Sequence, residues 1–367
     1  MEYRLKDCLE KVIDNRGKNP KYFDKEKYPV IDNVFIKNNY YINDKIVNRY
    51  INQETYDNFL RGYVEENMPI MTLVGSGIGN VGLIKNENVA IVQNTIGFKT
   101  KENLDPKYLY YWFLTKQDEL QSFNRGSGQP SIKKTDVENM EIDLPDIAIQ
   151  KKIVYILEKL DDKIYLNDQI NYNLYNQAVA IYNNSFQYNN NGDCSIGNYI
   201  IPKRGKNLLS KDAVLGDIPV VAGGLEPATY HNVSNTKAPV ITISASGANA
   251  GYINLWNVPV WSSDSSYIDK DITNNVYFWY VTLKTRQKEI FDAQTGSAQP
   301  HIYPQHIAEL PINKLNEDEI LQYEKKVTPF FDMIGNNKKE NKYLEQLRDT
   351  LLPKLMNGEI DLDKIEI

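Results

Sequence analysis

The chain has 367 residues, with 42 Lys and Arg against 48 Asp and Glu, so its formal net charge of −6 gives no argument for a polyanionic partner. This length exceeds what one ordinary core fills, so we expect two domains with connecting structure. The only cysteines, Cys8 and Cys194, lie far apart in sequence and predict no disulfide framework. No run of about 18 apolar residues occurs and no apolar signal region opens the chain, so we expect a soluble, cytoplasmic protein without membrane contact.

Residues 1–146 are predicted to form a mixed domain that is richer in strands than in helices. Residues 69–74 have the composition of a compact strand, and a glycine-rich turn ends it. Further strands are expected at 81–84 and 89–93, on either side of a polar turn. Apolar residues at helical spacing predict a helix within 106–123.

A long helix is expected over residues 147–187, because its apolar residues are spaced alternately four and three apart. This spacing is typical of a helix that packs against another helix along its whole length. The same spacing returns within residues 313–367. The two sets of seam residues are Ile153, Leu157, Leu160, Ile164, Leu174, Ala178 and Ile181, then Tyr323, Val327, Phe330, Ile334, Leu344 and Leu351.

Two asparagines interrupt each of these seams. When the two stretches run in opposite directions and residues whose numbers sum to 508 are paired, Asn167 meets Asn341 and Asn171 meets Asn337. Any slip would bury an amide without a partner, at a cost of roughly 1–3 kcal/mol. We therefore predict an antiparallel two-helix coiled coil whose register these four asparagines fix. The alternative is two separate amphipathic helices, each packed on its own domain.

Pro329 lies inside the second helical stretch. A proline removes one main-chain hydrogen bond and clashes with the preceding turn. We therefore expect a kink or a break near Thr328, with the distal helix running over residues 330–352.

The sequence is a tandem duplication. The letters of residues 16–19 return at 204–207, an offset of 188, and the segments 72–77 and 126–132 return at an offset of 170. The predicted parts are a first domain at 1–146, a central long helix at 147–187, a second domain at 188–312, and a distal long helix with a C-terminal tail at 313–367. The expected fold class is therefore α+β, with two similar mixed domains separated by two long antiparallel helices in a pseudo-two-fold repeat.

Three patterns have the letters of a catalytic or cofactor site, and we expect each to be something else. Residues 77–82 match a dinucleotide loop, but a strand rather than a helix is expected after them, which favours a hairpin turn. Asp146 and Asp161 match a metal-dependent nuclease, but they lie about 20 Å apart along one predicted helix and cannot share an ion. The three histidines have no cysteine near them, so a zinc site is not expected. We predict no cofactor, no metal and no catalytic residue.

Several segments together resemble the specificity subunit of type I restriction–modification enzymes. They are the Gly-Ser-Gly-Gln-Pro segment at 126–130, the Leu-Pro at 144–145, Gln150 in the heptad helix and the C-terminal stretch 347–360. The resemblance spans essentially the whole chain, and it implies that each domain is a target-recognition domain for one half of a split double-stranded DNA sequence. It also implies that the paired helices space the domains and dock two methyltransferase subunits. Restriction subunits would join through that methyltransferase core, and the chain itself would not be an enzyme.

Transfer by position gives candidates for contact with the duplex, because Arg and Lys suit phosphate and Gln can pair with adenine. In the first copy they are Arg16, Lys18, Ser76, Asn80, Arg125, Ser127, Gln129, Lys133 and Lys134. In the second copy they are Lys203, Arg204, Lys206, Ser246, Asn249, Thr295, Ser297, Gln299 and His301. Two alternatives remain open: the Gly-x-x-Gln-Pro loops are structural turns that anchor each domain to its helix, and the basic loops are merely solvated.

Lys and Arg outnumber Asp and Glu in none of the four predicted parts. The counterion release that drives most DNA affinity is then weak, so we expect the chain to need partner subunits to hold DNA tightly. One alternative is a stand-alone sequence-specific or architectural DNA-binding protein without a methyltransferase partner. Another is a metal-dependent nuclease in which Asp161 is essential.

Overall fold

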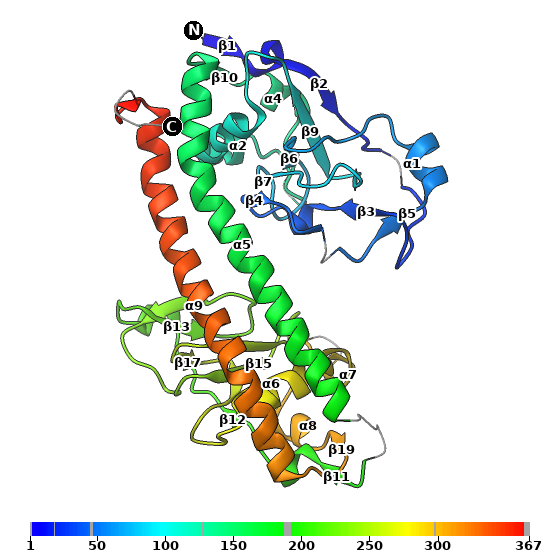
Figure 1. Ribbon diagram of the computed structural model, residues 1–367, viewed down its shortest axis with the longest axis vertical. Coiled ribbons are helices and arrows are strands. Elements are labelled where there is room, and N and C mark those ends of the chain that lie inside the picture. The colour runs from blue at the N-terminus through cyan, green and yellow to red at the C-terminus, as the bar shows by residue number, and fades with distance from the viewer. Residues whose placement is uncertain are drawn as a thin grey trace. The chain divides into compact units, whose positions relative to one another are not determined.

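The computed structural model describes residues 2–17, 19–44, 47–126, 128–186, 192–296 and 299–362. The chain forms two compact units, which we call unit 1 (Met1–Leu166 with Asn341–Ile367) and unit 2 (Asn167–Glu340). Each unit combines small sheets with helices (Figure 1), so the predicted α+β class is confirmed. No helix in the described part of the chain is long and apolar enough to cross a membrane.

Unit 1 is built on one five-stranded and one three-stranded sheet. The first has the order β2 (Leu9–Ile13), β9 (Thr95–Thr100), β6 (Pro69–Thr72), β7 (Val81–Leu83) and β4 (Asn39–Tyr41); the second has the order β5 (Tyr50–Ile51), β3 (Tyr28–Ile31) and β8 (Ala90–Ile91). A separate antiparallel pair joins β1 (Glu2–Arg4) to β10 (Glu141–Asp143). The helices are η1 (Leu5–Cys8), η2 (Asn33–Phe35), α1 (Gln53–Phe59), α2 (Pro106–Thr115), α3 (Gln117–Ser122) and α4 (Lys134–Glu138).

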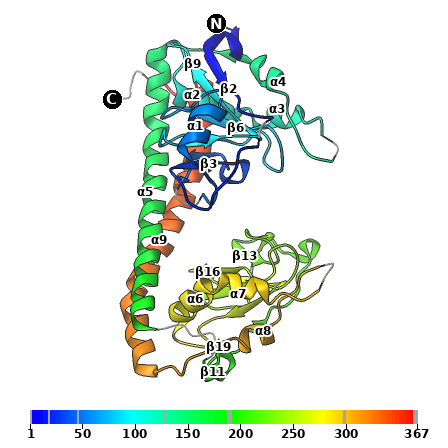
Figure 2. The ribbon, with the colours of Figure 1, turned by 90° about the vertical axis from the view of Figure 1, so that its right-hand side faces the viewer.

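Helix α2 fills the centre of unit 1. Asp105 accepts the backbone N–H groups of Lys107 and Tyr108, and a proline occupies the first helical position, which together fix where the helix begins. Every side chain from Tyr108 to Phe113 is buried, because α2 lies between the five-stranded sheet and the helix α5 (Ile147–Ser185) (Figure 2). The helix expected within 106–123 is therefore confirmed as α2 followed by α3.

Unit 2 repeats this architecture with fewer additions. Its larger sheet has the order β12 (Lys203–Arg204), β18 (Ser265–Ile268), β15 (Val240–Ser244) and β16 (Ile253–Trp256); its smaller sheet has the order β14 (Thr229–His231), β13 (Ile218–Val221) and β17 (Trp261–Ser262). An antiparallel pair joins β11 (Cys194–Ser195) to β19 (Pro311–Ile312). The helices are η4 (Ile196–Asn198), η5 (Ser210–Asp212), α6 (Val276–Thr285), α7 (Gln287–Asp292) and α8 (Pro304–Ala308), and then α9 (Glu317–Met356).

The strand orders of the two units correspond. The path β2-β9-β6-β7 matches β12-β18-β15-β16, and β5-β3-β8 matches β14-β13-β17, including the one parallel contact in each smaller sheet. In the described ranges, only unit 1 has β4 and α1. The predicted tandem duplication is therefore confirmed in the topology of the sheets.

The repeat offset of the glycine-rich turn is corrected by its hydrogen bonds. Gly79 N donates to Thr72 O at 2.9 Å, and Gly251 N donates to Ser244 O at 2.7 Å, so this turn repeats at 172 rather than at the expected 170. The reason is conformational, because the first and last positions need a positive φ: 105° and 79° at Gly75 and Gly79, then 82° and 83° at Gly247 and Gly251. Strand β7 follows the first turn, as expected of a hairpin rather than of a dinucleotide loop.

The Arg-Gly-Lys-Asn repeat is displaced in the same way. In unit 1, Ile13 of β2 lies opposite Gly97 of β9. In unit 2, Tyr267 of β18 occupies the position of Gly97, and Lys203 of β12 lies opposite it. Lys203 therefore corresponds to Ile13, and the structural offset is 190 instead of 188. The arginines that share this motif therefore do not occupy equivalent positions.

In each unit α5 packs antiparallel against α9. The alternative of two separate amphipathic helices, each packed only on its own domain, is therefore wrong. In unit 2, Asn337 Nδ2 donates to Asn171 Oδ1 at 2.9 Å, the pair expected from the sequence, and Asn167 Nδ2 donates to Glu340 Oε2 at 2.7 Å. In unit 1, α5 and α9 contribute Ile153, Leu157, Leu352 and Leu355 to one buried cluster. Asn167 and Asn341 belong to different units, so their pairing and the role of all four asparagines in the register stay predictions.

The expected break near Thr328, with a distal helix over residues 330–352, is wrong, because α9 is continuous from Glu317 to Met356 and contains both Pro329 and Pro353. Val327 and Phe331, which flank the proline, are both buried. Their packing stabilises the helix, and tertiary packing rather than local propensity provides most of a helix's stability. The Thr328 hydroxyl also donates to Glu324 O at 2.7 Å in the turn before the proline.

Candidate nucleic-acid interface

Two predicted loops of unit 1 meet at one edge. Gly75 N donates to Pro130 O at 3.0 Å, and Ile132 N donates to Leu73 O at 2.9 Å, so the glycine-rich turn and the Gly-Ser-Gly-Gln-Pro loop form one structure. Figure 2 shows this loop beside α4, on the side of the unit away from α5. Both Ser76 and Gln129 are exposed there. The described residues of the loop are thus anchored to the β6–β7 turn.

Unit 2 joins the equivalent loops in the same way. Gly247 N donates to Pro300 O at 3.1 Å, and Ile302 N donates to Ala245 O at 3.0 Å. Thr295 and His301 exchange backbone hydrogen bonds of 3.0 and 2.8 Å across the neck of the second loop. The two halves therefore present the same pair of turns on similar scaffolds.

Two of the predicted asparagines bond to their own unit's backbone. Asn80 Nδ2 donates to Ile36 O at 3.0 Å, and Asn249 Nδ2 donates to Gly223 O at 3.4 Å. Each amide therefore helps to hold its loop, and only the part of the side chain that these bonds leave open remains for a ligand.

Three predicted arginines are held by carboxylates. Arg125 Nη2 lies 2.9 Å from Asp136 Oδ1. Arg16 donates through Nε and Nη2 to the two oxygens of Asp14, at 2.9 and 2.7 Å, and these hydrogen bonds lower the pKa of that carboxyl. The third arginine, Arg204, donates through Nη2 to Asp264 Oδ1 at 2.6 Å.

Asp264 links several predicted residues of unit 2. Its second oxygen, Oδ2, accepts a hydrogen bond from the Ser246 hydroxyl, and its main-chain carbonyl accepts from Ala245 N at 3.1 Å. Ser246 in turn forms an isolated β-bridge with His301. The structure thereby brings together Arg204, Ser246 and His301, which lie far apart in the sequence.

The remaining described candidates are exposed or make local contacts. Lys133, Lys203, Lys206, Thr295 and Gln299 are exposed. Lys134 is half-buried and forms an ion pair of 3.4 Å with Glu138, and the His301 ring stacks on Tyr303 with centroids 6.1 Å apart. Lys18, Ser127 and Ser297 lie outside the described residues.

The three carboxylates that hold the arginines were not predicted from the sequence. Asp264 lies 60 residues from Arg204, and no local pattern links the two. Asp14 carried a usable signal, because it lies two residues from Arg16 in a turn.

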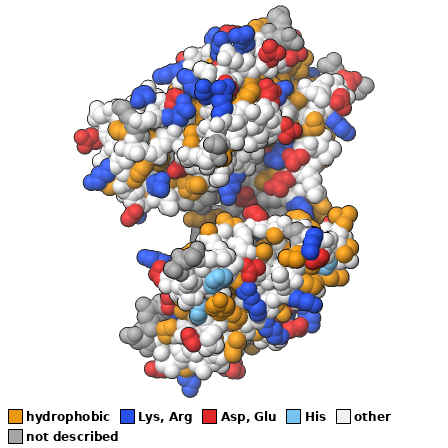
Figure 3. All heavy atoms as spheres, turned by 180° about the vertical axis from the view of Figure 1, so that it is seen from behind, with side chains coloured by type: hydrophobic (Ala, Val, Ile, Leu, Met, Phe, Trp, Pro, Cys, Tyr) orange, Lys and Arg blue, Asp and Glu red, His pale blue; other side chains and the backbone are white. Residues whose placement is uncertain are grey.

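On the face that Figure 3 shows, Lys and Arg side chains are interspersed with Asp and Glu side chains in both units. No group of three or more His, Cys, Asp or Glu side chains among the described residues could hold a metal ion. Asp161, the carboxylate of the nuclease alternative, is only 2% exposed, with Arg348 Nη1 at 2.8 Å and the Tyr111 hydroxyl at 2.7 Å. Its oxygens are thus occupied by structural partners.

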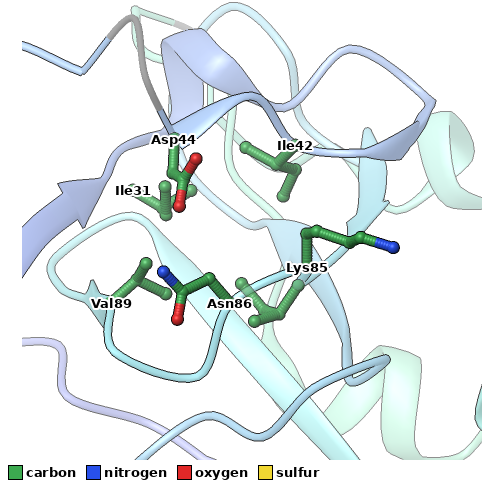
Figure 4. Close-up of a pocket in the computed structure, with 7 residues that line it drawn as sticks. Ile31, Ile42, Asp44, Lys85, Asn86 and Val89 are labelled. Atoms are coloured by element: carbon green, nitrogen blue, oxygen red, sulfur yellow. The ribbon is translucent and has the colours of Figure 1, made fainter. Parts of the chain in front are cut away.

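A shallow recess in unit 1 has an apolar floor formed by Ile31, Ile42, Ile84 and Val89. Asp44 and Asn86 lie on opposite sides of it, and Lys85 points away (Figure 4). The recess has no room for a molecule of the size of water. It therefore offers no site for a small organic ligand.

Comparison with known proteins agrees with this architecture. The family described as "Type I restriction modification DNA specificity domain" matches residues 1–176. The chain is 25% identical over 329 residues to the type I restriction enzyme MjaIX specificity subunit of Methanocaldococcus jannaschii, covering 76% of each chain. It is 34% identical over 110 residues to the MjaVIII specificity subunit of the same organism, covering 29% of this chain and 25% of the relative.

The crystal structure of a type I restriction–modification system S subunit from M. genitalium has a similar fold. The TM-score is 0.55 at 18% identity, with 97% of this chain and 95% of the other chain covered. Residues 1–176 thus match a DNA specificity domain, and the sheets of unit 2 repeat the strand order of unit 1. The chain belongs with the specificity subunits of type I restriction–modification systems, which recognise DNA.

Proposed function

We propose that unit 1 and unit 2 each bind one half of a bipartite DNA target. The observation that carries this proposal is the repeated scaffold, in which each unit presents a glycine-rich turn joined to a Gly-Ser-x-Gln-Pro loop on the side away from its long helices. The two scaffolds also differ from each other, because α1 occurs only in unit 1 in the described ranges. Mapping the methylated positions in the host genome tests the proposal: a split motif is expected, and a single undivided motif would contradict it.

The long helices dock two methyltransferase subunits in this proposal, and restriction subunits join through that core. Support comes from the parts of α5 and α9 in unit 1, which expose several large apolar side chains to solvent. Exposed apolar surface of this kind can mark a site of protein–protein contact. These side chains are Ile149, Tyr155, Leu166, Tyr343 and Leu347. The chain itself serves as a non-catalytic binding subunit.

Replacing Tyr343 and Leu347 with glutamate is expected to weaken capture of methyltransferase subunits at least about tenfold, because the exposed side chains then carry charge into an apolar interface. The thermal unfolding temperature should stay unchanged, since both side chains are exposed. Leu215→Glu is a matched control, because Leu215 is 95% exposed on a loop of unit 2. Equal capture by all variants would place the docking surface elsewhere.

We expect the isolated chain to bind its cognate duplex weakly, because no part of it is basic and counterion release is small. Adding methyltransferase subunits should tighten binding by orders of magnitude, as measured by fluorescence anisotropy at fixed salt. Tight, sequence-specific binding by the chain alone would contradict the need for methyltransferase subunits and favour a stand-alone DNA-binding protein. Co-purification with a methyltransferase distinguishes the two cases independently.

A further inference from the structure

We propose that Arg204, oriented by Asp264, reads a guanine in the half-site bound by unit 2 and does not bind phosphate. This inference rests on the proposed function and adds the base that one residue recognises. It starts from an ion pair in which Arg204 Nη2 lies 2.6 Å from Asp264 Oδ1 and the two side chains are 44% and 35% exposed.

The charge of this pair argues against a phosphate contact. A phosphate is attracted by net positive charge, and that attraction is long-range. Asp264 cancels the charge of Arg204 at close range, so the pair contributes little to counterion release. The N–H groups of the Arg204 guanidinium can still donate hydrogen bonds, and hydrogen bonds act only at short range.

The geometry favours a base edge. Asp264 Oδ1 takes one Nη2 donor, which leaves the other donors of the planar guanidinium available. Guanine presents two neutral acceptors, O6 and N7, in the major groove, and an arginine fork matches both. A guanidinium that is already held in place loses less conformational freedom when it binds.

Asp264 is itself held through both its side chain and its main chain. Ser246 donates to Asp264 Oδ2, and the Asp264 carbonyl accepts from Ala245 N at 3.1 Å. The backbone approaches closely here, because a Cβ added to Gly223 would lie 2.7 Å from Ser246 O. The carboxylate that binds Arg204 is therefore held in place by the segment around Ser246, which also pairs with His301. Asp264 acts as a positioning residue.

The test is selection of duplexes from a random pool by the full chain together with its methyltransferase subunits. Arg204→Lys keeps the charge but loses the fork, so one G·C pair of one half-site should lose its preference by roughly 5- to 150-fold while the other half-site is unchanged. Asp264→Asn should also relax that single position, and it should raise binding to unrelated DNA because one positive charge is no longer neutralised. Lys237→Ala is the matched control, because Lys237 forms an exposed ion pair with Asp271 at 2.7 Å in the same unit.

Two results would overturn the inference. The first is an unchanged motif in both Arg204→Lys and Arg204→Ala, with both variants folded by circular dichroism. The second is a uniform loss of affinity across all sequences in Arg204→Ala, with the salt slope reduced by about one, which identifies a phosphate contact. If the wild-type complex enriches no sequence at all, the proposed function fails first and this inference fails with it.

Discussion

Arg348→Ala is expected to destabilise unit 1 by about 3–5 kcal/mol, because it leaves the carboxylate of Asp161 buried without its cation. Arg348 and Asp161 are 13% and 2% exposed, and their atoms lie 2.8 Å apart between α9 and α5. A loss of this size lowers the unfolding midpoint by roughly 10 °C in a unit of this length. Thermal unfolding measures this loss of stability, and faster hydrogen exchange in α2 and in residues 147–166 of α5 should localise it to unit 1.

Acidification should reduce this deficit. Burial already raises the pKa of Asp161 despite the Arg348 guanidinium, and without that cation the pKa rises further. A group with a raised pKa in the folded state is best accommodated when protonated, so the variant regains stability as the pH falls.

Two controls define the result. Arg49→Ala breaks an exposed pair with Asp32 and should cost less than about 1 kcal/mol. Asp161→Asn combined with Arg348→Met removes both charges and keeps an acceptor for the Tyr111 hydroxyl, so it should recover most of the loss. If Arg348→Ala costs no more than Arg49→Ala, the buried pair does not hold the helices together.

The stability of unit 2 should fall by about 2–3 kcal/mol between pH 5 and pH 8 because of Glu324. This α9 side chain is buried and accepts the N–H groups of Tyr277 and Phe278 at 3.1 and 2.7 Å, at the start of α6. It caps a helix whose own N-cap residue, Asn275, makes no capping bond.

Stability falls with rising pH because the pKa of Glu324 is higher in the folded state than in the unfolded state. Burial raises the pKa of Glu324 to about 7, and the two backbone hydrogen bonds and nearby Lys270 only partly oppose this. The folded state therefore binds the proton more tightly than the unfolded state. The stabilisation is complete below the unfolded pKa of this side chain and is lost as the pH rises through 7.

Glu324→Gln is the informative variant, because glutamine resembles the protonated acid. Urea unfolding should show equal stabilities at pH 5, and at pH 8 the variant should be more stable than the wild type. Glu309→Gln is the control, because Glu309 is exposed in the same unit. A wild-type profile that is flat from pH 5 to pH 8, or identical slopes in wild type and Glu324→Gln, would contradict the assignment.

The sequence alone determined the features that repeat along the chain. Heptad spacing predicted α5 and α9, and the amide pair of Asn171 and Asn337 was predicted from the mirrored positions. Glycine and strand signals predicted the β6–β7 hairpin. These features are local or periodic, so each residue type carries its own conformational preference.

Only the tertiary structure decided how distant side chains are used. It kept α9 helical through Pro329, because buried neighbours outweigh one lost hydrogen bond. It placed Asp161 in a buried ion pair and Asp264 beside Arg204, contacts between residues 187 and 60 positions apart. No periodic spacing in the sequence predicts such pairs. They form only where the packing of helices and strands brings two polar groups together, and where leaving one of them buried without a partner would cost free energy.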